Sequence, residues 1–444
     1  MPIYLTEFLV HPKNENSIYK TAERITAFCL IKSVDQKSAL SISIFEAEKD
    51  RWDIKEVIRH PTIVSRESFI GQDIGLEQFN KAEKYGRAML YQAVDSRVSE
   101  LTVEEIDGDD GNVGNFFKTK NDLSKKGKCL HFDAGEDCDV VINAHSVQKS
   151  QSLTAIAKDG HIYALANKIE LDGSITVQKK SIQKFSTFRG FCKYHDNRIF
   201  EPIDNALLEP TPHQATLYAY RSLCRELYVK ENALTLLTQQ LAELKEENRI
   251  TKFISDLRVG TENGLGPLLN KKKKLDQALK NKDYRSIRYV TFECHSKPTL
   301  SFSGIFYPEF DFQGRPLQNL SIIGHEFSLM TFCSAPTNYG WAVIFSWHQS
   351  DDFICMSFMN SFKELIRNGN NLGDAVFRLV LSTCENIAYS PDWWESLETH
   401  KKEELIKIIR INADPWIQIT NDYLMSGLDN IVQWEFDRFR SSYE

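Results

Sequence analysis

The sequence has little that would mark a secreted, membrane-embedded or fibrous protein. No apolar run approaches the roughly 18 residues that are needed to span a bilayer, which argues against a transmembrane helix. The opening residues MPIYLTE lack a basic segment followed by an apolar one, so no signal peptide is expected. No internal repeat or low-complexity tract is present. These absences predict a cytoplasmic protein that makes no contact with a membrane.

Cysteine is too scattered for a disulfide framework. The nine cysteines of this 444-residue chain are odd in number and widely spaced, whereas disulfide-rich folds are short and pair their cysteines. Free cysteine is among the most buried residue types, so most of them are expected to be reduced core residues. This expectation applies to Cys29, Cys224, Cys333, Cys355 and Cys384.

An overall basic charge is also absent, because the net charge is −7. This value argues against a molecule that binds polyanions over its whole surface. The stretch 116–200 differs, since it holds 14 Lys and Arg against 9 Asp and Glu, a balance of +5 that leaves −12 for the remainder. The asymmetry is a modest indication of an anionic ligand near this stretch.

Two pairs of metal-binding residue types stand out in the same stretch. Cys129 and Cys138 are separated by eight residues, and Cys192 and His195 by two. A short Cys-x-x-His turn can aim both donors at one point, while the first pair needs a hairpin to return Cys138 to Cys129. Three thiolates and one imidazole suit tetrahedral zinc. The alternative is that these residues are buried cysteines and a core histidine.

The pattern resembles the treble clef of HNH (ββα-metal) endonucleases, which has a ligand pair, a histidine at the end of a hairpin strand and a second ligand pair. The resemblance covers about seventy residues. It implies a first knuckle at Cys129 and Cys138 and a second at Cys192 and His195. The chain departs from the family in its eight-residue first spacing and in the 46 residues between His145 and Cys192.

The same resemblance implies a catalytic assignment. His145 would be the general base, and Asp196 would bind Mg²⁺ or Mn²⁺, since a hard oxygen donor suits these ions. Four basic residues would contact the phosphates of DNA or RNA: Lys149, Arg189, Lys193 and Arg198. His145 could equally be a core histidine or a zinc ligand in place of His195.

The hydropathy pattern predicts a multidomain α+β protein. Residues 1–103 are expected to form a ferredoxin-like α+β domain, with a helix at 17–31, strands at 39–47 and 52–63 and a helix at 76–94. Residues 104–115 suit a linker, and residues 116–210 would form the treble-clef-like zinc domain. A helical hairpin at 211–284 and an antiparallel sheet with C-terminal helices at 285–444 would follow.

Thr211 and Pro212 are a favourable start for the first hairpin helix. The leucine spacing between 234 and 244 needs a partner helix, either from the same chain or from a second copy. The four lysines 271–274 suit a solvated face or phosphate contacts. In the C-terminal region, 372–384, 403–411 and 422–439 are expected to be helical. Residues 384–395 resemble a feature of bacterial proteins from mobile or defence-related gene neighbourhoods.

Three functions fit these observations. The first is a zinc protein that binds nucleic acid and cuts it with a second divalent metal. The second is a non-enzymatic interaction or scaffold protein in which zinc only stabilises the fold, as structural zinc does in small modules. The third places a small-molecule or peptide site on the C-terminal sheet.

Overall fold

The computed structural model describes residues 1–12, 25–50, 52–69, 73–93, 119, 122–166, 176–244, 249–320, 326–413 and 419–443. The chain forms two compact units, one made mainly by Met1–Gly108 and the other by Asp109–Ile169, Ile175–Leu320 and Glu326–Glu444. The expected linker at 104–115 lies outside the described residues. Among the helices of the described segments, none is both long and apolar enough to cross a membrane.

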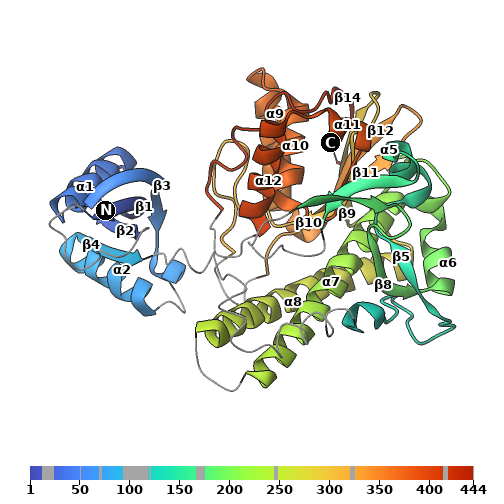
Figure 1. The fold of residues 1–444 in the computed structure, drawn as a ribbon, viewed down its shortest axis with the longest axis horizontal. Helices are drawn as coiled ribbons and strands as arrows, with labels where there is room; N and C mark the ends of the chain where they lie inside the picture. The colour runs from blue at the N-terminus through green and yellow to red at the C-terminus, as the bar shows by residue number, and fades with distance from the viewer. Residues whose placement is uncertain are drawn as a thin grey trace. The chain divides into compact units, whose positions relative to one another are not determined.

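The N-terminal unit is a four-stranded antiparallel sheet with two helices, and its strand order is β3-β1-β2-β4 (Figure 1). Its elements in chain order are β1 (Ile3–Pro12), β2 (Ile25–Lys32), α1 (Gln36–Lys49), β3 (Trp52–Val64), α2 (Asp73–Tyr85) and β4 (Arg87–Ala93). β1 and β2 are antiparallel neighbours, with Val10 opposite Ile25. A ferredoxin-like order would place a helical crossover between them, so the observed order differs from the predicted one.

Two predictions within this unit are wrong. Residues 25–31 of the expected first helix lie in β2, and the expected strand at 39–47 lies within α1. α1 begins after Asp35, whose side chain accepts the N–H of Ser38 at 2.7 Å and so caps the helix. The buried positions of α1 are four, three and one residues apart, a helical spacing: Ala39, Ser43, Glu46 and Ala47.

The larger unit is built on an eight-stranded sheet of order β14-β9-β12-β11-β10-β13-β6-β7. Most strands come from the C-terminal region: β9 (Ile287–Cys294), β10 (Leu300–Phe306), β11 (Met330–Pro336), β12 (Trp341–His348), β13 (Ile387–Tyr389) and β14 (Phe436–Ser441). They pair antiparallel, which agrees with the antiparallel sheet that was predicted within 285–444. β6 (His161–Leu165) and β7 (Val177–Ser181) extend this sheet, so the segments 116–210 and 285–444 share it.

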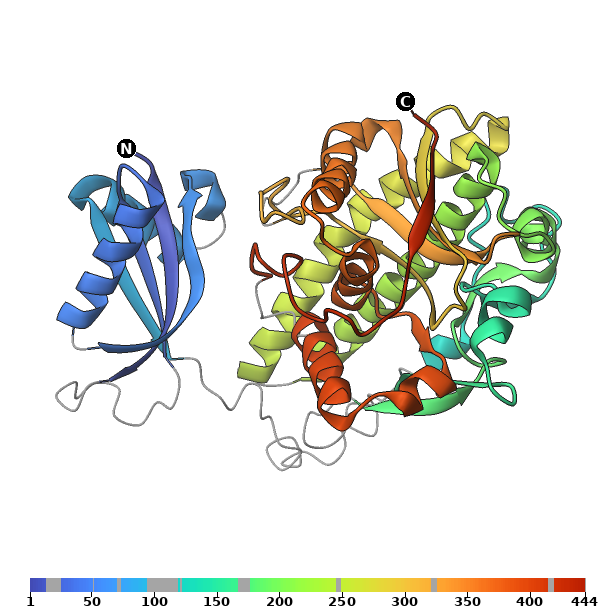
Figure 2. The ribbon, with the colours of Figure 1, turned by 90° about the horizontal axis from the view of Figure 1, so that it is seen from above.

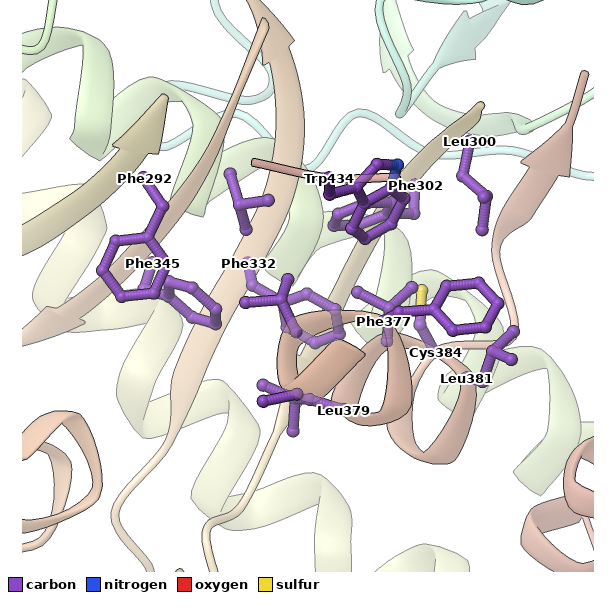
Figure 3. Close-up of a cluster of buried hydrophobic side chains, with 14 of the residues drawn as sticks. Phe292, Leu300, Phe302, Phe332, Phe345, Phe377, Leu379, Leu381, Cys384 and Trp434 are labelled. Atoms are coloured by element: carbon purple, nitrogen blue, oxygen red, sulfur yellow. The ribbon is translucent and has the colours of Figure 1, made fainter. Parts of the chain in front are cut away.

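The central strands of the larger unit's sheet are buried on both faces. Along β12, Val343 and Phe345 belong to one core cluster, whereas Ala342 and Ile344 belong to the other. The first cluster includes α9 (Asp352–Arg367) and α10 (Leu372–Thr383), and Figure 3 shows Phe377 and other side chains of α10 beneath the sheet aromatics. The second packs against α7 (Pro212–Glu243). This alternation places apolar side chains on both faces of one strand.

α7 and α8 (Arg249–Asn281) form an intramolecular helix pair, visible in both ribbon views (Figures 1 and 2). The side chain of Thr211 caps α7 by accepting the N–H of Gln214 at 3.2 Å, which confirms the predicted start. The lysine run does not form one solvated face. Lys271 is buried in an ion pair with Asp351 at 2.6 Å.

Only part of the predicted helical C-terminal end is confirmed. α10, α11 (Pro391–Ser396) and α12 (Thr399–Ala413) are helices, but residues 436–441 form the strand β14 rather than part of a helix at 422–439. β14 pairs with β9, and its Phe439 lies opposite Phe292. An available sheet edge therefore overrides the local helical pattern.

The core cluster around β12 predicts a large effect of Phe345→Ala. Phe345 is fully buried and its ring packs against Phe292, Phe332 and Phe362, so the truncation leaves a cavity. We expect the free energy of unfolding to fall by about 3–5 kcal/mol in chemical denaturation. The control is Phe353→Ala, which removes a ring that is 84% exposed and should change it by less than about 0.5 kcal/mol. Equal effects of the two changes would contradict this packing.

Candidate metal centre

The first ligand pair lies on a turn that runs beside β8 (Thr187–Cys192). The N–H of Lys128 donates to the carbonyl of Arg189 at 3.1 Å, and that of Leu130 to the carbonyl of Gly190 at 2.8 Å. Gly135 has a φ of +102°, a left-handed conformation that glycine adopts without a steric penalty. This bend returns Cys138 toward Cys129.

The second pair lies where β8 meets α6 (Lys193–Asp204). Cys192 is the N-cap of α6, and its Sγ accepts the N–H of His195 at 3.4 Å. The carboxylate of Asp139 accepts the N–H of Tyr194 at 2.9 Å. These contacts satisfy N–H groups that a helix leaves unpaired in its first turn.

The two pairs converge on one point. The ligand atoms of Cys129, Cys138, Cys192 and His195 all lie within 4.8 Å of one another. His195 Nδ1 lies 3.5, 3.5 and 3.2 Å from the Sγ atoms of Cys129, Cys138 and Cys192. Sulfur and nitrogen ligands of a tetrahedral zinc ion lie roughly 3.5 Å apart, given bond lengths of about 2.3 and 2.0 Å. The group could therefore hold a metal ion, as its spacing predicted.

The four ligands of the centre differ in how deeply they are buried. Cys192 and His195 are buried, Cys129 is half-buried and Cys138 is exposed. Burial raises the pKa of the Cys129 thiol to about 11. The N–H of Gly135 donates to Cys138 Sγ at 3.3 Å. A metal requires deprotonated sulfur, so its binding would release protons.

A second histidine lies against the centre and was not anticipated. The rings of His131 and His195 stack with centroids 4.0 Å apart and planes at 12°. Burial, together with the charge on His195, lowers the pKa of His131 to about 4. His131 Nδ1 accepts the N–H of Asp133 at 3.1 Å. The only sequence signal for this neighbour was its position two residues after Cys129.

His145 lies outside the group of four. It ends β5 (Val141–His145), where it pairs with Thr187 of β8. His145 Nε2 lies 3.1 Å from the carbonyl oxygen of Ile182, and the side chain is half-buried. A carbonyl only accepts, so Nε2 carries the proton and Nδ1 keeps its lone pair. Burial lowers the pKa of His145 and so favours the neutral ring.

Asp196 follows His195 in the first turn of α6. Its Oδ1 is buried and has no hydrogen-bond partner among the described residues. Burial raises its pKa to about 6 against the opposing attraction of Arg221. Asp204 and Arg221 influence the pKa of both Asp196 and His145, so both side chains lie near one ion pair.

That ion pair is the other feature that sequence reasoning missed. Arg221 of α7 donates two bonds to the carboxylate of Asp204 at 2.7 and 2.6 Å. Its guanidinium is buried and lies 4.0 Å from the ring centroid of Phe200. Nothing in the local sequence predicts it, because 16 residues separate the two partners and their contact depends on how α6 packs on α7.

The four basic residues that were predicted to contact phosphates have different environments. Lys193 is exposed. Lys149 donates to Gln183 at 2.7 Å, and Arg198 donates to the hydroxyl of Tyr194 at 2.7 Å. Arg189 is half-buried and donates to the carbonyl of Val141 at 3.0 Å. Arg189 is therefore committed to holding β5 against β8, whereas the other three retain exposed or surface positions.

The fold and the centre together define an α+β protein with a Cys₃His group that could hold a metal ion. No family model, no curated protein and no solved structure matches the chain.

The close approach beside the first knuckle predicts that Gly127→Ala weakens metal binding. A Cβ at this position would lie 2.6 Å from the Cβ and the carbonyl oxygen of Arg189, so the knuckle would have to move away from β8. We expect a lower metal affinity, measured by competition with a chromophoric chelator. Gly266→Ala is the control, because a Cβ there meets nothing within 4 Å. Unchanged affinity in Gly127→Ala would contradict this account of the knuckle.

Proposed function

We propose that this chain is a zinc-binding protein whose ion is held by Cys129, Cys138, Cys192 and His195. The observation that carries the proposal is the convergence of three sulfur atoms and one imidazole nitrogen within 4.8 Å. Soft thiolates select zinc, copper(I) or iron–sulfur clusters, and a single tetrahedral S₃N set is a common form of structural zinc. Unlike copper and iron, zinc has no redox chemistry, so it can serve as a purely structural ion.

The role of this zinc is structural. Four protein ligands fill a tetrahedral site and leave no open position for substrate or water. The ion would join the knuckle at 129–138 to the N-terminus of α6, and α6 packs on α7, which in turn packs on the sheet. In this role zinc fixes the position of β5, β8 and α6 relative to the core.

Metal-dependent phosphodiester hydrolysis is the second candidate, and the state of His145 favours it. A neutral imidazole with one nitrogen donating to the carbonyl of Ile182 and the other free to accept is suited to act as a general base. The succession of knuckle, β5, β8 and α6 resembles a treble clef, with Asp196 available for Mg²⁺ or Mn²⁺. Lys149, Lys193 and Arg198 would contact the phosphates of DNA or RNA.

A scaffold without catalysis is the alternative. Arg189 is occupied by the carbonyl of Val141, and Asp196 lies partly buried beside the Asp204–Arg221 pair, which are features of a packed interior. In a scaffold, zinc would only stabilise the fold, and surfaces of the larger unit would bind a protein partner. This alternative also predicts that two copies of the chain could form a homodimer through α7 and α8.

The zinc proposal predicts one zinc ion per chain in elemental analysis and its loss in Cys192→Ser. Losing the ion should lower the thermal unfolding midpoint, because metal binding contributes directly to folding free energy. The control is Cys29→Ser, which alters a buried cysteine of the N-terminal unit and should leave zinc content unchanged. Purified protein with no transition metal, or equal zinc in both variants, would overturn the proposal.

The hydrolytic candidate predicts cleavage of DNA or RNA with Mg²⁺ or Mn²⁺ that His145→Ala reduces by about 10²-fold or more, as expected for loss of a general base. Zinc content should stay at the wild-type level in this variant. His161→Ala is the matched control, because it removes an exposed histidine that was not assigned to the site. Equal cleavage by wild type and His145→Ala, or no cleavage by either, would contradict the hydrolytic candidate, and only the structural role of zinc would remain.

A further inference from the structure

The larger unit contains a cavity of about 850 Å³ that the metal centre does not explain. Its walls come from the β6–β7 hairpin, the turn into β8, α7 and the segment that joins α10 to β13. None of the four proposed zinc ligands lines it. Its volume is within the range of roughly 300–1,000 Å³ that is typical of small-molecule sites.

The charges that line the cavity are mainly positive. Lys179, Lys180 and Lys184 come from β7 and the turn after it, and Arg225 comes from α7. Glu385 is the one carboxylate among the described lining residues. The lining therefore carries a formal charge of +3 in a chain whose net charge is −7. A concave surface of one sign concentrates ligands of the opposite sign.

The four cations of the lining differ in whether another side chain neutralises them. Arg225 is engaged by Glu226 in an ion pair, and Glu226 lines a smaller adjoining cavity of about 280 Å³. By contrast, neither Lys179 nor Lys184 forms an ion pair within the described part of the chain. Lys180 Nζ donates to the carbonyl of Leu165 at 2.5 Å, which holds this side chain along the wall.

The remaining wall is apolar and partly aromatic. Phe185, Phe188 and Tyr228 line it, and the rings of Phe188 and Tyr228 pack with centroids 5.9 Å apart. Tyr228 is fixed by its hydroxyl, which donates toward the carbonyls of Ser124 and Lys126. A cationic end combined with a rigid apolar wall suits an organic anion better than a bare inorganic one.

We propose that this cavity binds a phosphorylated small molecule of nucleotide size. Lys179 and Lys184 would contact the phosphate oxygens, and the aromatic wall would contact the organic part. Asn386 and Glu385, which also line the cavity, would contact its polar edge. Asn386 is held in place by its Nδ2, which donates to Ser146 Oγ at 2.9 Å. This binding is separate from zinc and does not depend on hydrolysis by His145.

Calorimetric titration of the full chain tests the proposal with four probes: ATP, AMP, pyrophosphate and adenosine. ATP should bind more tightly than AMP, because more phosphate charge faces the lysines, and adenosine should bind much more weakly. The double variant Lys179→Glu, Lys184→Glu should weaken ATP binding at least about tenfold, which is the size expected for reversing charges beside a bound anion. Both lysines are exposed, so their replacement should leave the thermal unfolding midpoint unchanged.

Lys363→Glu on α9 is the control, because it makes the charge change of each single substitution at an exposed residue outside the cavity, and it is compared with Lys179→Glu and Lys184→Glu made one at a time. His145→Ala should bind ATP like the wild type, which separates this proposal from the hydrolytic one. Should the double variant fold poorly, a rise in ionic strength should still weaken the binding of ATP by the wild type more than that of adenosine. No binding of ATP or pyrophosphate, equal binding of ATP and adenosine, or equal losses in the cavity and control variants would overturn the proposal.

Discussion

Three sulfur atoms and one imidazole nitrogen meet at a point between two chain segments that are more than fifty residues apart. Their approach depends on backbone contacts rather than on the ligands alone. The turn at 128–130 bonds to β8, and Cys192 both ends β8 and caps α6. Without a cation between them, the four donors would be crowded at high cost, because buried thiols resist ionisation. The positions of β5, α6 and α7 follow from this convergence.

The sheet of the larger unit provides the support on which this centre rests. Its central strands are apolar on both faces, with α7 on one side and α9 and α10 on the other. α7 belongs to two interactions at once, because its side chains pack on the sheet and its Arg221 binds Asp204 at the end of α6. A disturbance of the centre is thereby coupled to the core. The cavity lies further along the same helix, at Arg225 and Tyr228, where β6 and β7 extend the sheet.

Sequence patterns succeeded where a local rule was strong. Thr211 and Pro212 started a helix because a capping hydroxyl and a proline both favour that position. The antiparallel sheet that was predicted within 285–444 is present, and 341–348 form its strand β12. Alternation of apolar residues, the rule for strands, failed for α1, where it predicted a strand at 39–47. There the cap at Asp35 and the small buried residues Ala39 and Ala47, which let the helix lie close to the sheet, decided the outcome.

Residue types and spacings by themselves determined the four metal-ligand candidates, the buried reduced cysteines and the antiparallel pairing of β9 to β12 in the large sheet. These features depend on nearby residues and on the chemistry of single side chains. Only the tertiary structure decided that β6 and β7 join β13, that Lys271 is buried against Asp351, and that the lysines of β7 line a cavity with Arg225 of α7. Each of these depends on contacts between residues that are far apart in the chain. Such contacts leave no local periodicity in the sequence, because they are selected by the packing of whole elements.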